Sequence, residues 1–291
     1  MNLMGNALEV IETGPLATVQ DLGRSGYADM GVGTSGAADR GSFRLANRLV
    51  GNQEAAAAVE VTFGGLVVRA RHDVTVAVTG ASCPVTVDDR VEAINSLLRL
   101  RAGAVLRLGP PVRGLRSYLA VRGGIDVRPV LGSRATDLLS GLGPECLRPG
   151  VLLPIETPTG PLPAIGFAPV ANLPEDDLIL TVVPGPRDDW FERSALVTLL
   201  SEPYTVTPES NRIGIRLDGP ALIRTNDAEL PSEGMVAGAL QVPPSGRLTL
   251  FLADHPVTGG YPVVAVVVAT DVDKAAQARP GMRIRFSGTR N

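Results

Sequence analysis

Short apolar stretches, several of them alternating with polar residues, run along most of the chain and predict β-strands. Clusters of Gly, Pro, Asp and Asn separate them, as is typical of all-β barrels and sandwiches. The predicted strands are 8–11, 66–69, 74–78, 105–108, 117–121, 178–183, 212–217, 248–252, 263–268 and 282–286. Helices are predicted only over 37–50 and near 188–201, with a turn at 272–278. The pattern therefore predicts a mainly β protein with a few short helices.

A proline-rich stretch divides the pattern. Residues 154–177 contain six prolines and show no clear periodicity. Because proline removes a hydrogen-bond donor and keeps the chain extended, this stretch predicts a semi-rigid connector. The predicted organisation is an N-terminal β domain over 1–155, a connector over 156–177 and a C-terminal β domain over 178–291, with interweaving of the two domains allowed. The alternative is a loop that follows the surface of one domain.

Residues 31–36 read GVGTSG and match the glycine spacing of a dinucleotide-binding loop. That loop requires a buried strand before it, a helix after it and an acidic residue about 20 positions later. A helix does follow, but the preceding DLGRSGYADM contains two glycines, two aspartates and an arginine, unlike a buried parallel strand. We therefore interpret these glycines as loop geometry.

Composition and charge narrow the range of functions that the sequence supports. The 291 residues carry a net charge of −3, which gives no support for a nucleic-acid or anionic-membrane surface. The start of the chain lacks the basic and apolar regions of a signal peptide, and the longest apolar run, 263–269, is too short to cross a bilayer. A cytoplasmic protein without a membrane segment is expected. The two cysteines and two histidines match no metal-binding spacing, so no metal site is predicted.

Three segments combine glycine with charged residues and are candidate sites. In the first, residues 18–40, five glycines permit positive φ and close approach of the backbone to a ligand. Its polar residues are Gln20, Asp21, Arg24, Ser35 and Asp39. The alternative is a structural loop with an exposed Asp21–Arg24 ion pair, which would contribute little stability.

The second and third segments are 121–141 and 240–263. In the second, Ser133 and Arg134 are suited to binding a carboxylate or phosphate, or Arg134 is simply solvated. In the third, a strand ends at Asp254, which could accept an amide N–H or act as a base, and a Gly259–Gly260 turn could bind an anion through its amides. The alternative there is a hairpin with a structural aspartate.

Taken together and in order, eight blocks resemble the biotin-dependent carboxyltransferase, or allophanate hydrolase subunit 2, family. The blocks are GPLATVQDLGRSGY, GVGTSGAADRGSFRLANRLVGN, VTGA, RSYLAVRGGID, LGSRATD, NRIGIRLDGP, SEGMVAGALQVPPSGRLTLFLADHPVTGGYP and RPGMRIRF. The resemblance extends from about Val10 to Phe286, essentially the whole chain. The resemblance implies a cyclophilin-like β-barrel architecture.

The resemblance also implies an activity and partners. Stand-alone bacterial members of the family include one component of an ATP-dependent 5-oxoprolinase, which hydrolyses 5-oxo-L-proline to L-glutamate. That component works with a kinase-inhibitor-like partner, the allophanate hydrolase subunit 1 homologue, and with a larger partner of the lactam-utilisation type. This implies ATP use by the complex and an inactive isolated chain. Two alternatives are the carboxyltransferase half of a biotin-dependent urea carboxylase and a non-enzymatic regulator that binds the kinase-inhibitor-like partner.

Biotin is not expected on this chain. Lys274 is its only lysine and does not lie in the Ala-Met-Lys-Met-like setting that carries biotin. This fits both enzymatic alternatives, since the resemblance implies that the biotin-carrier domain of the urea enzymes is separate.

The positions that match the family form the candidate site. The resemblance implies that Arg24, Arg212 and the Gly259–Gly260 turn stabilise an oxyanion, while Asp254 and Gln241 orient the ring amide. The predicted catalytic residues are Arg24, Arg212 and Asp254. The predicted substrate-binding residues are Gln20, Asp21, Ser35, Asp39, Gln241, Thr258, Gly259, Gly260 and Tyr261. The chain departs from the family at 255–257, where His-Pro-Val replaces the usual Arg-Gln-Thr beside the predicted site, so the exact substrate stays open.

Overall fold

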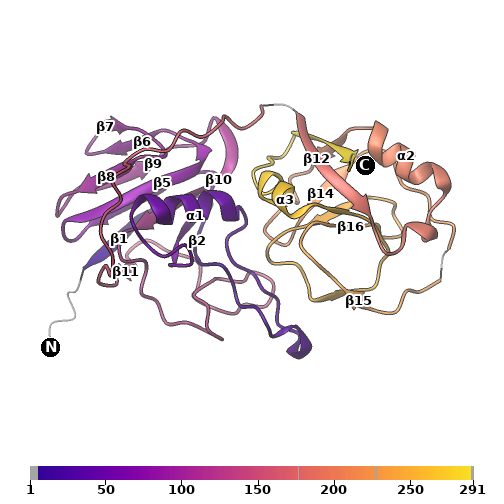
Figure 1. The fold of residues 1–291 in the computed structure, drawn as a ribbon, viewed down its shortest axis with the longest axis horizontal. Coiled ribbons are helices and arrows are strands. Elements are labelled where there is room, and N and C mark those ends of the chain that lie inside the picture. The colour runs from indigo at the N-terminus through magenta and orange to yellow at the C-terminus, as the bar shows by residue number, and fades with distance from the viewer. Residues whose placement is uncertain (1–5, 176, 227, 290–291) are drawn as a thin grey trace. The chain divides into compact units, whose positions relative to one another are not determined.

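The chain folds into two compact units, each assembled from three segments. The structure, a computed structural model, describes residues 6–175, 177–226 and 228–289 (Figure 1). The N-terminal unit comprises Met1–Arg24, Asp39–Asp137 and Gly141–Leu173, and the C-terminal unit comprises Ser25–Ala38, Leu138–Ser140 and Pro174–Asn291. Two short segments of the N-terminal half belong to the C-terminal unit, an interweaving that the predicted organisation allowed.

The proline-rich stretch up to residue 173 belongs to the N-terminal unit. The Leu97 N–H donates to Gly166 O (2.7 Å), and the Ala168 N–H donates to Asn95 O (2.9 Å). Arg122 also donates through Nη2 to the carbonyl of Gly160. These bonds hold the stretch along the surface of the unit, which corresponds to the alternative interpretation of this sequence, a loop that follows one domain, rather than to a semi-rigid connector.

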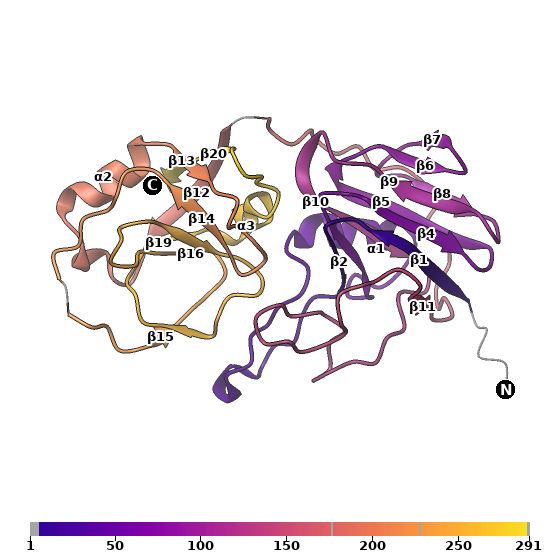
Figure 2. The same cartoon turned by 180° about the vertical axis from the view of Figure 1, so that it is seen from behind.

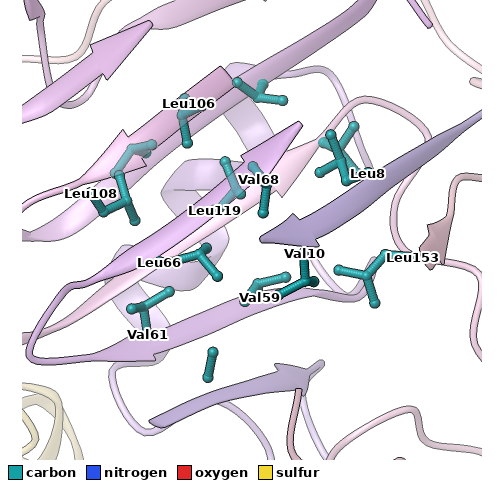
Figure 3. Packing of buried hydrophobic residues seen from close by; sticks show 14 of the residues in the cluster. Leu8, Val10, Val59, Val61, Leu66, Val68, Leu106, Leu108, Leu119 and Leu153 are labelled. Carbon is teal, nitrogen blue, oxygen red and sulfur yellow. The ribbon is translucent and has the colours of Figure 1, made fainter. Parts of the chain in front are cut away.

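The N-terminal unit is a sandwich of two antiparallel sheets. The six-stranded sheet has the order β11 (Leu152–Pro154), β1 (Ala7–Thr13), β4 (Leu66–Ala70), β9 (Val105–Leu108), β6 (Val85–Val87) and β7 (Arg90–Glu92). The five-stranded sheet has the order β2 (Leu16–Gln20), β3 (Ala58–Thr62), β10 (Arg113–Val121), β5 (Val74–Ser82) and β8 (Leu97–Leu100). Aliphatic side chains from both sheets, such as Val10 and Val59, fill the space between them (Figure 3).

Helix α1 (Arg40–Leu49) covers the other face of the five-stranded sheet, against β10 and β5 (Figure 1). Its first residue follows Asp39, whose carboxylate accepts hydrogen bonds from the Ser42 N–H (2.9 Å) and hydroxyl (2.7 Å). Its apolar side packs on the sheet, where Phe43 meets Tyr118 edge to face with ring centroids 6.0 Å apart. The helix predicted over 37–50 is thus confirmed, and Asp39 sets its start.

A row of polar side chains crosses the sheet beneath α1. Thr18, Glu60, Tyr118 and Thr79 are direct neighbours on β2, β3, β10 and β5. The Tyr118 hydroxyl donates to Glu60 Oε2 (2.9 Å) and accepts from the Asp39 N–H (2.7 Å). Since Glu60 and Tyr118 are buried, these bonds satisfy groups that water cannot reach, and they tie the start of α1 to the sheet.

Replacing Tyr118 with phenylalanine is expected to change how stability depends on pH. Burial, with the charges of Glu60 and Asp39, raises the pKa of Tyr118 well above 10. In the unfolded chain this phenol ionises near pH 10, so the stability it contributes is complete below that pH and declines by about 1.4 kcal/mol per unit as pH rises further. In urea titrations followed by circular dichroism from neutral to about pH 11, the variant should lose less stability than the wild type. Equal losses would contradict the prediction.

The C-terminal unit is built around a closed seven-stranded barrel (Figure 2). The barrel has the order β12 (Asp177–Pro184), β19 (Val263–Val267), β16 (Ala239–Gln241), β17 (Thr249–Phe251), β14 (Gly214–Asp218), β13 (Tyr204–Val206) and β20 (Arg283–Gly288). All pairs are antiparallel except β12 with β20. Leu180, Leu250 and Ile284 are among the aliphatic residues that fill its interior. The predicted mainly β barrel architecture is confirmed.

Short elements complete this unit. They are 3-10 helices η1 (Ala28–Met30) and η2 (Asp188–Trp190), α-helices α2 (Arg193–Ser201) and α3 (Ala269–Ala275), and paired strands β15 (Glu233–Gly234) and β18 (Thr258–Gly259). The predicted helix near 188–201 is therefore η2 followed by α2, and the turn predicted at 272–278 overlaps α3. None of the helices among the described residues is long and apolar enough to cross a membrane.

Candidate functional site

In the N-terminal unit, Asp21 holds the loop that carries Ser133 and Arg134. Its Oδ1 accepts the Ser133 hydroxyl (2.6 Å) and the Gly23 N–H (2.7 Å), and its Oδ2 accepts the Arg134 N–H (2.6 Å). Ser133 and Arg134 thus bind a carboxylate, as their chemistry suggested, but one that belongs to the protein. The alternative of an exposed Asp21–Arg24 pair is wrong, because both residues are buried and Arg24 has other partners.

Arg24 and Gln20 lie side by side against the chain at 135–137. Arg24 donates through Nη2 to the carbonyl of Ala135, and its Nη1 lies 3.8 Å from Asp137 Oδ2. Gln20 donates through Nε2 to Thr136 O (2.9 Å) and to Thr18 Oγ1 (3.0 Å). Gly143 makes room for this arrangement, since a Cβ there would lie 2.0 Å from Ala135 O and 3.1 Å from Arg24 Nη2.

Both side chains keep polar atoms without partners. Arg24 is 2% exposed and Gln20 is fully buried. Within the described part of the chain, Arg24 Nε and Nη1 and Gln20 Oε1 have no hydrogen-bond partner. Buried polar groups of this kind are costly and uncommon in proteins, so such a cluster is a candidate for ligand recognition. It offers two cationic donors and one acceptor.

In the C-terminal unit, Asp254 is held by four hydrogen bonds. Its Oδ1 accepts the Ser35 hydroxyl (2.6 Å) and Arg212 Nη2 (2.9 Å), while its Oδ2 accepts Arg212 Nε (2.9 Å) and the Leu138 N–H (3.1 Å). The Arg212 guanidinium also donates to Gly36 O (2.6 Å). Ser35 has a φ of 54°, unusual for a residue other than glycine, and this conformation is kept where its hydroxyl contacts Asp254.

This arrangement favours a structural role for Asp254 and Arg212. Each oxygen of the carboxylate already accepts two hydrogen bonds, two of them in a bidentate pair with the guanidinium. A proton abstracted from a substrate would have to displace one of them. The cluster joins residues 35–36, 138, 212 and 254, which are distant in the sequence, and it thereby holds four segments together.

The remaining predicted residues lie on the outer face of the barrel. Gln241 donates through Nε2 to Tyr261 O (3.2 Å), and a Cβ on Gly259 would lie 2.7 Å from that same nitrogen. Thr258 and Gly259 form β18 rather than a turn, and neither Gly259 nor Gly260 has a positive φ. Gly259 thus lies in a short strand and not in the predicted Gly259–Gly260 turn, whereas the grouping of Gln241 with 259–261 is seen in the structure.

The predicted site residues thus form local groups. Gln20, Asp21 and Arg24 share one group, Ser35, Arg212 and Asp254 a second, and Gln241 lies with 258–261 in a third, while Asp39 caps α1. The sequence analysis did not select Asp137 or Gly143, which border Arg24, because no motif near either residue in the sequence indicates a site. No group of three His, Cys, Asp or Glu side chains suited to a metal ion occurs among the described residues.

Comparison with known proteins gives consistent relatives. The family model described as carboxyltransferase domain, subdomain A and B, matches residues 30–288 of this chain. A 5-oxoprolinase subunit of Escherichia coli (strain K12) is 40% identical over 283 residues, covering 96% of this chain and 90% of the relative. The urea amidolyase of Lachancea kluyveri is 34% identical over 306 residues, covering 96% of this chain but 17% of the relative.

A solved structure has the same fold along nearly the whole chain. The crystal structure of TTHA0988 superposes with a TM-score of 0.89 at 36% identity, covering 98% of this chain and 56% of that one. This chain therefore spans about half the length of that relative. With a family model over most of its residues and a relative of similar length at 40% identity, the chain belongs to the carboxyltransferase domain family, subdomains A and B.

Proposed function

We propose that this chain is the carboxyltransferase-type component of an ATP-dependent 5-oxoprolinase, a hydrolase complex that converts 5-oxo-L-proline to L-glutamate in the cytoplasm. The observation that carries the proposal is the 40% identity to the Escherichia coli 5-oxoprolinase subunit over almost the full length of both chains. The partners in the proposal are a kinase-inhibitor-like protein and a lactam-utilisation protein. ATP is hydrolysed at the level of the complex, and the isolated chain is inactive.

Within this function, Arg24 and Gln20 would contact the lactam. 5-Oxoproline carries an amide N–H, a ring carbonyl and a carboxylate, which complement one acceptor and two cationic donors. Hydrolysis passes through a species with negative charge on the former carbonyl oxygen, and preorganised donors lower the energy of such charge. Nε and Nη1 of Arg24, which make no hydrogen bond within the described residues, support this role, and Oε1 of Gln20, which accepts none there, supports binding of the ring N–H.

Asp254, Arg212 and Ser35 would act as positioning residues rather than as catalytic ones. Their hydrogen bonds are made to one another and to the backbone at Gly36 and Leu138. Asp21 has the same role for the loop at 133–134. Gln241 and residues 258–261 are retained as a second candidate surface for substrate. Biotin is not attached to this chain in the proposal, since Lys274 is its only lysine and does not lie in the sequence setting that carries biotin.

The second candidate is the carboxyltransferase half of a biotin-dependent urea enzyme. The 34% identity to a urea amidolyase favours it, but this chain covers only 17% of that protein. The 5-oxoprolinase relative, by contrast, is more similar in sequence, at 40% identity. A non-enzymatic regulator of a kinase-inhibitor-like protein is the third candidate, and it requires the same partner.

The decisive experiment is reconstitution. We expect this chain, purified with the kinase-inhibitor-like and lactam-utilisation proteins, to release ADP only when 5-oxoproline is present and to produce equimolar glutamate. Complexes that lack any one chain are the controls. Turnover on urea with a biotin carrier and none on 5-oxoproline would favour the second candidate. The third candidate would be favoured if a complex of this chain with the kinase-inhibitor-like protein had no enzymatic activity but relieved inhibition of a kinase.

A further inference from the structure

The C-terminal unit contains a cavity of about 360 Å³ that none of the predicted site residues lines. It opens beside the loops that connect β13 to β14 and β16 to β17. Its polar lining residues are Thr207, Glu209, Arg216, Ser245, Arg247 and Thr249. Its volume lies in the range of small-molecule sites in proteins.

Arg216 is held in place at the wall of this cavity. It faces outward from β14, between the buried Ile215 and Leu217, and lies directly opposite Thr249 on β17. Its Nη1 donates to Thr249 Oγ1 at 2.6 Å. Because Thr249 is only 3% exposed, its hydroxyl is a fixed partner that orients the guanidinium.

The charge of Arg216 has no carboxylate partner within 4 Å among the described residues, whereas Arg187, Arg212 and Arg283 each have one. Arg247 adds a second guanidinium to the lining, 3.9 Å from the exposed Asp218. Glu209 is the one carboxylate among the residues that line the cavity, so the lining carries a net positive charge. An oriented guanidinium with donors left over is suited to an oxyanion, which it can bind through two parallel hydrogen bonds.

We propose that this cavity binds a small ligand through a carboxylate or phosphate group, with Arg216 as the principal contact and Thr249 as the residue that orients it. The ligand carries further groups, since the cavity is larger than a bare oxyanion needs. The site does not depend on the proposed 5-oxoprolinase function, and it can be tested on the full chain alone.

The test is calorimetric titration of the full chain at low ionic strength, which limits screening of this exposed pair of arginines. Inorganic phosphate probes a phosphoryl ligand, and acetate probes a carboxylate ligand. We expect saturable binding of at least one. Arg216→Gln should weaken it by about tenfold or more, because a charge-assisted pair of hydrogen bonds is lost. Thr249→Val should weaken it by a smaller factor.

Arg99→Gln, which removes an exposed arginine from β8 of the other unit, is the matched control and should bind like the wild type. Thermal melting should show that both arginine variants fold. Binding of neither probe would overturn the proposal, and so would equal affinities for the wild type and Arg216→Gln. Tighter binding of phosphate than of acetate would identify a phosphorylated ligand class, and the reverse order a carboxylate class.

Discussion

Replacing Asp254 with asparagine is expected to lower the free energy of unfolding of the C-terminal unit by about 3–5 kcal/mol, the usual cost of breaking a buried ion pair. The carboxylate is buried and accepts four hydrogen bonds, two of them from Arg212. The amide of asparagine would place an N–H group toward at least one of these donors and would leave the buried guanidinium uncompensated. Urea titration followed by fluorescence reports on this unit, because Trp190 is the only tryptophan of the chain.

The matched control is Asp218→Asn, which removes a carboxylate that lies 3.9 Å from Arg247 with its side chain 64% exposed. Exposed pairs of this kind contribute about 0–1 kcal/mol, so this variant should unfold nearly like the wild type. If Asp254→Asn also changed stability by less than about 1 kcal/mol, the cluster would not hold the loops together as we infer. A large loss of turnover at unchanged stability would restore Asp254 to a catalytic role.

Much of the fold was predictable from the spacing of apolar residues. Each predicted strand overlaps an observed one, because alternating or continuous runs such as 178–183 and 263–268 have one face in a core. The strand predicted from residue 212 begins at Gly214, since Arg212 turns its side chain toward Asp254 before the ladder starts. Among the strands that were missed, β16 is three residues long, too short to show a period.

Strand β3 was missed for a different reason. Its sequence AVEVT alternates, but both faces are buried: valines point into the sandwich, and Glu60 points beneath α1. The sequence of this strand does not show that Glu60 is buried and bonded to Tyr118, so the burial of both faces was not predictable. The exact division into two units was not predictable either, because residues 25–38 and 138–140 join the C-terminal unit through contacts with residues distant in the sequence.

The positions of the candidate-site residues were predictable from the sequence, but the role of each residue was not. Residue types and family resemblance both selected Arg24 and Asp254, and the resemblance alone added Arg212. Sequence does not tell whether an arginine pairs with an internal carboxylate or keeps donors for a ligand. The structure shows a difference of degree: Arg212 donates two hydrogen bonds to Asp254, whereas Arg24 lies 3.8 Å from Asp137 and has two nitrogen atoms that lack hydrogen bonds among the described residues.

Replacing Arg24 with lysine is expected to reduce kcat/KM for 5-oxoproline about 100-fold in the reconstituted complex, the scale of losing an oxyanion donor. Lysine keeps the positive charge, but it lacks the planar fork with its separate Nε and Nη1 donors. If these donors act on charge that develops in the transition state, kcat falls. If they bind the substrate carboxylate throughout, KM rises instead.

Stability distinguishes this effect from simple damage to the fold. Arg24 keeps two buried donors that make no hydrogen bond in the described part of the chain, which costs stability in the folded chain, so its replacement should change the free energy of unfolding far less than Asp254→Asn does. Arg48→Lys is the control: Arg48 lies on α1, pairs with Glu54 and has a side chain 57% exposed, so its variant should retain full turnover. Wild-type kinetics in an Arg24→Lys complex would show that substrate does not use these donors. If the Arg24→Lys chain is inactive and unfolds as readily as Asp254→Asn, the role of Arg24 is structural instead.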